Sequence, residues 1–177
     1  MNAVVVYESI YGNTRAVAEA IGEGLGHVKV VAVADAVADS DVGAADLLVA
    51  GGPTHMHGMA TSLSRRMSVE AAKEDGHAEV EPGAADPPGL RRWLRDLTAP
   101  PKGRAAAFDT RIDKSPSVTG AAARGIARRL RHRGYEVIAR ESFLVEDSEG
   151  PLTDGELDRA RAWGAALAQQ VATAGVA

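Results

Sequence analysis

The chain has 177 residues, of which 45% are hydrophobic and 25% are charged, and this length fits one ordinary domain. It contains no cysteine, which excludes disulfides, iron–sulfur clusters, thiolate zinc sites and a cysteine nucleophile. The net charge of −4 and the aromatic content of 4% disfavour a dedicated nucleic-acid binder. No apolar stretch approaches the ~20 residues of a membrane span, and no basic run precedes the first apolar residues. We therefore expect a single cytoplasmic domain over residues 1–177 without a signal peptide.

Short apolar segments alternate along the chain with segments of helical periodicity. A strand is predicted from Ala3 to Tyr7, because consecutive apolar, largely β-branched residues are typical of a strand buried on both faces. A helix is predicted next, since apolar residues recur at helical spacing from Val17 to Leu25 before Gly26. The same patterns predict further strands at 28–33, 45–50, 104–108 and 135–145, and helices at 90–97, at 122–130 and after a Thr153–Glu156 capping box.

This alternation favours an α/β fold, namely a doubly wound, five-stranded parallel sheet with helices on both faces in three layers. Because parallel crossovers are right-handed, few topologies remain, and the strand order 2-1-3-4-5 fits best. Ligands of such sheets bind beyond the carboxyl ends of the strands, at the switch point between strands 1 and 3. The loops after strands 1, 3 and 4 are therefore the candidate site.

The segment 70–88 differs from the rest of the chain. Between Glu70 and Asp86 it carries six acidic residues against one basic residue, Lys73, and it ends in Asp86-Pro87-Pro88-Gly89. A segment of this composition buries little apolar area. We therefore expect a mobile acidic insertion at 70–88 on the surface of the single domain, dispensable for folding.

The loop after the first strand is a candidate phosphate site. It begins at Ser9 and ends at Thr14, where a helix starts and its backbone N–H groups converge with a partial positive charge. Gly12 can take a positive φ and lets a ligand approach the backbone closely. The loop has no lysine, so neutral donors would hold the phosphate. The alternative interpretation is an ordinary strand-to-helix turn with Thr14 as its N-cap.

These segments together resemble the flavodoxin family. The resemblance covers nearly the whole chain outside the insertion and is carried by Val4 to Leu25, by Gly52-Pro53-Thr54-His55-Met56-His57-Gly58-Met59, and more weakly by Ala106-Ala107-Phe108-Asp109-Thr110-Arg111. It implies the flavodoxin-like sheet order and FMN as the cofactor. The residues it implies as FMN contacts are Ser9, Ile10, Tyr11, Gly12, Asn13 and Thr14 at the phosphate, Pro53, Thr54, His55, Met56, His57 and Gly58 in the loop along the isoalloxazine, and Asp109, Thr110 and Arg111 at its pyrimidine side.

The second and third of these loops depart from the family pattern. Flavodoxins usually sandwich the flavin between aromatic side chains of these loops, and here neither Pro53 to Met59 nor Asp109 to Ser117 contains Trp, Tyr or Phe. Stacking would fall to His55, His57, Met56 or Arg111. Because losing an aromatic face costs about 0.5–1.5 kcal/mol per pair, we expect FMN to bind more weakly than in a dedicated carrier.

Two other patterns have competing interpretations. The pair His55 and His57 is a poor metal site, because zinc needs three or four ligands, and we predict no metal ligand and no catalytic residue. An arginine-rich helix follows strand 4, and its basic face is expected to be solvated, with docking of an acidic redox partner as the alternative. The arginines concerned are Arg124, Arg128, Arg129, Arg131 and Arg133.

The resemblance implies an FMN-binding protein that acts in electron transfer, in which the flavin performs the chemistry and the protein supplies binding, orientation and electrostatics. Its partner would be a redox protein or a small quinone-like acceptor, with no nucleic acid. One alternative is an FMN-dependent NAD(P)H:quinone-type reductase, and another is a binding or regulatory module of the same fold with weak or no flavin. The sequence shows no nicotinamide site, so a carrier is preferred to an enzyme.

Overall fold

The computed structural model describes residues 2–37, 40–55, 57–74, 76–98, 100 and 103–174. A two-residue strand, β4 (Gly58–Met59), pairs antiparallel with the end of β3. The five other strands are parallel, in the order β2-β1-β3-β5-β6, so the predicted order 2-1-3-4-5 is confirmed. They are β1 (Ala3–Tyr7), β2 (Lys29–Ala32), β3 (Leu47–His55), β5 (Arg104–Ile112) and β6 (Glu136–Val145).

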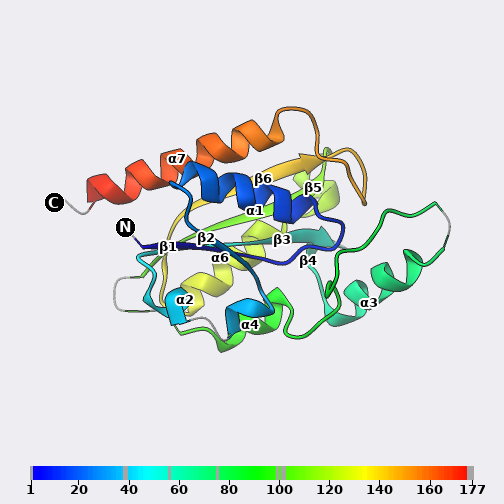
Figure 1. The fold of residues 1–177 in the computed structure, drawn as a ribbon, viewed down its shortest axis with the longest axis horizontal. Helices are drawn as coiled ribbons and strands as arrows, with labels where there is room; N and C mark the ends of the chain where they lie inside the picture. The colour runs from blue at the N-terminus through cyan, green and yellow to red at the C-terminus, as the bar shows by residue number, and fades with distance from the viewer. Residues whose placement is uncertain are drawn as a thin grey trace.

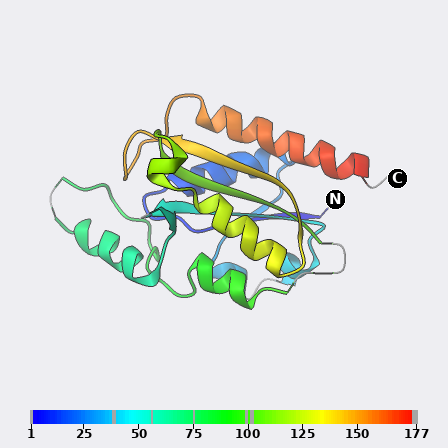
Figure 2. The ribbon, with the colours of Figure 1, turned by 180° about the vertical axis from the view of Figure 1, so that it is seen from behind.

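Helices cover both faces of the sheet, which gives the three predicted layers (Figure 1, Figure 2). On one face, α1 (Asn13–Gly24) and α7 (Glu156–Ala174) lie side by side. The other face carries α2 (Ser40–Ala44), α4 (Leu90–Asp96) and α6 (Ala122–His132), while α3 (Ser62–Ala71), α5 (Pro116–Thr119) and the 3-10 turn η1 (Asp35–Val37) belong to the connections. Within the described ranges, no helix is both long enough and apolar enough to cross a membrane.

Each face of the sheet has its own hydrophobic core. Because neighbouring residues of a strand point to opposite faces, the consecutive apolar residues of β1 serve both cores. Val4 packs in the core that contains Trp93 and Ile126, whereas Val5 packs in the core that contains Phe143. The strands are therefore buried on both sides, which is the reason for their unbroken apolar pattern.

A close backbone contact joins α1 and α7. A Cβ atom on Gly24 of α1 would overlap the carbonyl oxygen of Arg161, and one on Gly164 of α7 would overlap the carbonyl oxygen of Ile21. Only glycine allows the two helices to approach this closely. The glycine-rich end of α1 is therefore a packing surface for α7 as well as a helix end.

At the helix ends the structure contradicts one alternative interpretation, Thr14 as an N-cap, and one prediction, the Thr153–Glu156 capping box. Helix α1 begins at Asn13 after Gly12, whose φ of 86° is left-handed, so Thr14 is not the N-cap. Helix α7 begins at Glu156, and the Thr153 hydroxyl is buried without a hydrogen-bond partner instead of capping the helix. The Glu156 carboxylate does not complete a capping box, because it accepts a hydrogen bond from the Leu144 N–H.

The 70–88 insertion runs from the end of α3 toward α4 (Figure 1). It contacts the loop after β1, because the Glu81 N–H donates to the Ile10 carbonyl oxygen at 2.8 Å and the Glu81 carboxylate pairs with Arg15 at 2.8 Å. It also contacts the loop after β6, where the Glu149 carboxylate pairs with the His77 ring. Its mobility stays a prediction, but its contacts lie at the candidate site.

Candidate functional site

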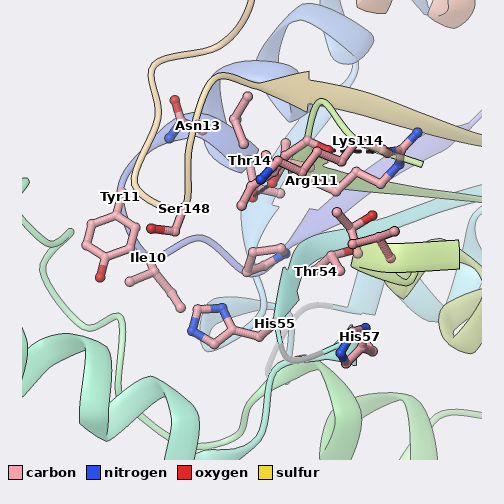
Figure 3. A pocket seen from close by; sticks show the side chains of 16 residues that line it. Ile10, Tyr11, Asn13, Thr14, Thr54, His55, His57, Arg111, Lys114 and Ser148 are labelled. Atoms are coloured by element: carbon pink, nitrogen blue, oxygen red, sulfur yellow. Dashed lines mark hydrogen bonds between the residues drawn. The ribbon is translucent and has the colours of Figure 1, made fainter. Parts of the chain in front are cut away.

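The loops that follow β1, β3 and β5 meet around a cavity of about 440 Å³ (Figure 3). This volume lies within the range of small-molecule and cofactor sites, roughly 300–1,000 Å³. Ten of the residues that line the cavity, from Ile10 to Arg111, belong to the set predicted from the sequence. The lining residues are Ile10, Tyr11, Asn13, Thr14, Pro53, Thr54, His55, His57, Thr110, Arg111, Ile112, Lys114, Val118, Thr119, Val145 and Ser148.

The remaining predicted residues do not all have a place on the wall of this cavity. Ser9, Gly12, Gly58 and Asp109 are absent from the described residues that line it. Met56 lies outside the described residues. Ser9 and Gly12 shape the loop after β1, and Asp109 lies in the core beneath the cavity.

The loop after β1 ends in a helix N-terminus with free donors. The Ser9 hydroxyl accepts a hydrogen bond from the Gly12 N–H at 3.2 Å, which closes the turn. The backbone N–H groups of Asn13, Thr14 and Arg15 have no hydrogen-bond partner among the described residues. Unpaired N–H groups at a helix start carry the positive end of the helix dipole. The loop is therefore suited to hold a phosphate group.

Two hydrogen bonds tie this loop to its neighbours. The Thr14 and Thr110 hydroxyl oxygens lie 2.7 Å apart and are buried, so the first turn of α1 and the end of β5 are in direct contact. The Asn13 side-chain amide donates to the Glu149 carbonyl oxygen at 3.0 Å. The loop after β6 therefore forms part of the same wall, and Ser148 from that loop lines the cavity.

Thr54 and Asp109 hold the N-terminus of α6 beside the cavity. The Thr54 hydroxyl donates to Asp109 Oδ2 at 2.8 Å and accepts from the Ala122 N–H at 2.8 Å. Asp109 Oδ2 also accepts from the Ala123 N–H at 2.9 Å. Because α6 has no side-chain cap from its own N-cap residue, Ala121, this buried carboxylate takes that role. The implied contact of Asp109 with the flavin stays a prediction.

The two histidines of the second loop differ in their surroundings. The His55 Nε2 lies 3.2 Å from the Ser68 hydroxyl of α3, and partial burial lowers the pKa of His55. His57 has a positive φ of 70°, and its backbone forms a bridge with Gly120. Figure 3 shows the two rings separated on the same side of the cavity. Burial therefore favours the uncharged form of the His55 ring.

The third loop brings cationic side chains to the cavity. The Arg111 guanidinium donates to the carbonyl oxygens of Ile112, at 3.2 Å, and of Lys114. These bonds close the loop on itself and fix the Arg111 guanidinium, and both Arg111 and Lys114 line the cavity. An anionic ligand would meet positive charge on this side.

Six lining residues are not among the site residues predicted from the sequence: Ile112, Lys114, Val118, Thr119, Val145 and Ser148. Val145 ends the last strand, so the rule that ligands bind at carboxyl ends would have found its loop if it had been applied to strand 5 as well. The aromatic ring at the cavity is that of Tyr11 (Figure 3), which the sequence analysis placed at the phosphate.

Comparison with known proteins gives a consistent result for the fold. Residues 5–89 match the family model for flavodoxin. The chain is similar to the solved structure of a flavodoxin from the domain Archaea, with 23% identity, a TM-score of 0.58 and coverage of 97% of this chain and 99% of that one. The chain is also similar to the solved structure of a WrbA-like flavodoxin from Agrobacterium tumefaciens, with 19% identity, a TM-score of 0.58 and coverage of 97% of this chain and 98% of that one. Oxidised flavodoxin 1 from Bacillus cereus is similar as well, with 17% identity, a TM-score of 0.59 and coverage of 94% of this chain and 97% of that one. A search of curated protein sequences finds no match.

Proposed function

We propose that this chain, which belongs to the flavodoxin family, binds FMN in the cavity between its loops and transfers electrons. The observation that carries the proposal is the start of α1. There the backbone N–H groups of Asn13 and Thr14 are without partners among the described residues, and both residues line the cavity. A phosphate monoester carries about −1.5 to −2 charges at neutral pH, and such a helix start stabilises it.

The proposed roles follow from where each group lies on the cavity wall. The backbone from Gly12 to Arg15 would hold the phosphate, and Tyr11 and Pro53 would pack against the flavin ring. His55 and His57 would line its edge. Bound FMN supplies the reversible uptake of electrons, while these residues bind and orient it.

The open edge of the cavity supports exchange with a partner. Val118 lines the cavity and is 60% exposed, so a redox protein or a small quinone-like acceptor can reach this edge. The sequence shows no nicotinamide site. A carrier is therefore the preferred form of the proposal.

Flavin titration tests the proposal. The purified protein is titrated with FMN and with riboflavin, following quenching of flavin fluorescence. We expect FMN to bind at least tenfold more tightly, because riboflavin lacks the phosphate. Equal affinities would overturn the phosphate site, and no binding of either flavin would favour the binding-module alternative.

Two glycine variants sharpen the test. Gly12→Val should abolish the preference for FMN, because φ is +86° there and a β-branched residue would distort the phosphate loop. Gly26→Val is the matched control, since φ is +101° at Gly26 but nothing lies within 4 Å of its Cβ position. A reductase would in addition consume NAD(P)H in the presence of a quinone, whereas a carrier would not.

A further inference from the structure

A second cavity, of about 650 Å³, lies between the start of α3, the start of α4 and the end of α6. It shares no lining residue with the cavity proposed for FMN. Six arginines line it, and the described lining residues include no aspartate or glutamate. We call it the arginine pocket, after Arg65, Arg91, Arg92, Arg95, Arg129 and Arg133.

Two carboxylates, Asp96 and Glu8, compensate part of this charge. Asp96 lies 3.2 Å from Arg95 and 3.7 Å from Arg92, and Glu8 pairs with Arg65 at 3.0 Å. The three others, Arg91, Arg129 and Arg133, form no ion pair in the part of the chain that the structure describes. The pocket therefore carries an excess of positive charge.

Two of the three uncompensated arginines are held in place by backbone carbonyls. Arg91 donates to the Met59 carbonyl oxygen at 2.8 Å, and Arg129 donates to the Gly125 carbonyl oxygen at 3.2 Å. Each bond uses one of the five N–H donors of a guanidinium, so the others stay available. Burial lowers the pKa of Arg129, and the neighbouring Arg91 and Arg128 lower it further.

Arg65 contributes a buried side chain to the wall of the arginine pocket. Its side chain is only 5% exposed, and its Nε is buried without a hydrogen-bond partner among the described residues. The guanidinium lies directly against the backbone of Gly89, where any Cβ atom would overlap it. A buried donor without a partner is unfavourable, so an acceptor at this place would be stabilising.

We propose that the arginine pocket binds a phosphorylated small molecule of about nucleotide size. Guanidinium groups bind phosphate oxygens through paired N–H donors, and Arg91, Arg129 and Arg133 offer them. Pro87, Pro88 and Leu94 supply an apolar wall for the rest of the ligand. The volume also fits a small-molecule site. The described residues that line the pocket include no Trp, Tyr or Phe on which nucleic-acid bases could stack, so a small ligand is favoured over single-stranded nucleic acid.

Calorimetric titration of the FMN-saturated protein tests this proposal. The probes are pyrophosphate and ADP, with adenosine as the ligand that lacks phosphate. We expect the two anions to bind and adenosine not to. Titration without FMN should give the same affinities, and displacement of either anion by FMN would place binding in the flavin site and overturn the proposal.

Two double variants with equal charge change locate the binding. Arg129→Gln with Arg133→Gln should weaken ADP binding at least tenfold. Arg128→Gln with Arg131→Gln should change it less than twofold, because these arginines are on the same helix but do not line the pocket. Equal weakening in both would mean diffuse attraction and overturn the proposal. Binding of polyglutamate or DNA without binding of ADP would also overturn it, in favour of a docking surface.

Discussion

The hydroxyl oxygens of Thr14 and Thr110 lie 2.7 Å apart in the buried floor of the candidate site, although 96 residues separate them in the sequence. Thr14 is in the first turn of α1 and Thr110 is near the end of β5. Their side chains are almost completely buried, with exposures of 2% and 5%. The bond therefore connects the loop proposed to hold phosphate with the loop proposed to border the flavin ring.

Thr110→Val should destabilise the protein by about 1–2 kcal/mol, because it leaves the Thr14 hydroxyl buried without its partner. Thr14→Val should cost a similar amount, and the double variant should cost less than both single changes together, since the two residues share one interaction. The measurement is the free energy of unfolding in urea. Strictly additive losses would contradict a direct coupling. Thr119→Val, whose hydroxyl bonds only locally to Ser115 and Gly120, is the control.

The ion pair between His77 and Glu149 should make the attachment of the 70–88 insertion depend on pH. The hydrogen bond with Glu149 raises the pKa of His77 from 6.5. The Ala78 N–H and His77 together lower the pKa of Glu149 from 4.5. The contribution of His77 to stability is therefore full below pH 6.5 and is lost as the pH rises through its raised pKa. That of Glu149 is full above pH 4.5 and is lost as the pH falls.

The measurement is the free energy of unfolding of the wild type and of His77→Gln between pH 4 and pH 9. The wild type should be the more stable in the weakly acidic range, and the difference should vanish at alkaline pH. His27→Gln serves as the control for loss of a histidine elsewhere. A difference that grows as the pH rises would have the wrong sign and refute the assignment.

Replacing residues 73–86 with a short Gly/Ser linker should change the free energy of unfolding by no more than about 1 kcal/mol. Loop-closure entropy varies slowly with length, and exposed ion pairs contribute roughly 0–1 kcal/mol each. The affinity for FMN should nevertheless rise, because the replacement removes the Glu81 carboxylate, which lies 3.8 Å from the Cβ position of Gly12.

Glu81→Gln alone should reproduce this rise in affinity, since it removes the same negative charge and releases Arg15 from its ion pair. Glu79→Gln in the same segment is the control. A loss of several kcal/mol in the linker variant would instead show that the insertion is a packed part of the fold.

The cationic third loop should raise the midpoint potential of bound flavin. A nearby positive charge stabilises the reduced, anionic flavin, and two unit charges at ~4 Å interact by about 4 kcal/mol at an effective dielectric constant of 20. A tenfold change in a one-electron equilibrium corresponds to ~59 mV. Arg111→Gln and Lys114→Gln should therefore each lower the potential by tens of millivolts in a redox titration. Lys73→Gln, outside the cavity, should leave it unchanged.

The order of the sheet could be predicted from the sequence because the strands are buried on both faces. Val4, Val5 and Val6 serve two cores, so the strand cannot alternate with polar residues and stands out in the sequence. The loops of the candidate site follow from the strands, since the carboxyl ends of parallel strands share one edge.

The side-chain partners could not be predicted, because tertiary contacts decide them. The Thr153–Glu156 pattern has the spacing of a capping box, but Glu156 binds the Leu144 N–H and Arg159 instead. Glu8 and Arg65 are both 5% exposed and paired with each other. Nothing in the local pattern around Arg65 distinguishes it from a solvated arginine such as its neighbour Arg66.

The contact of Gly24 with α7 determines where the other end of α1 lies. Helix α1 has 12 residues and, at about 1.5 Å per residue, is roughly 18 Å long. Because its backbone touches that of α7 near Gly164, α1 can neither slide nor roll without a collision there. The position of the free N–H groups relative to the sheet is therefore fixed by the contact with α7 at the opposite end of α1. Larger residues at Gly24 or Gly164 would push α1 away from α7 and so displace the phosphate loop at the opposite end of α1.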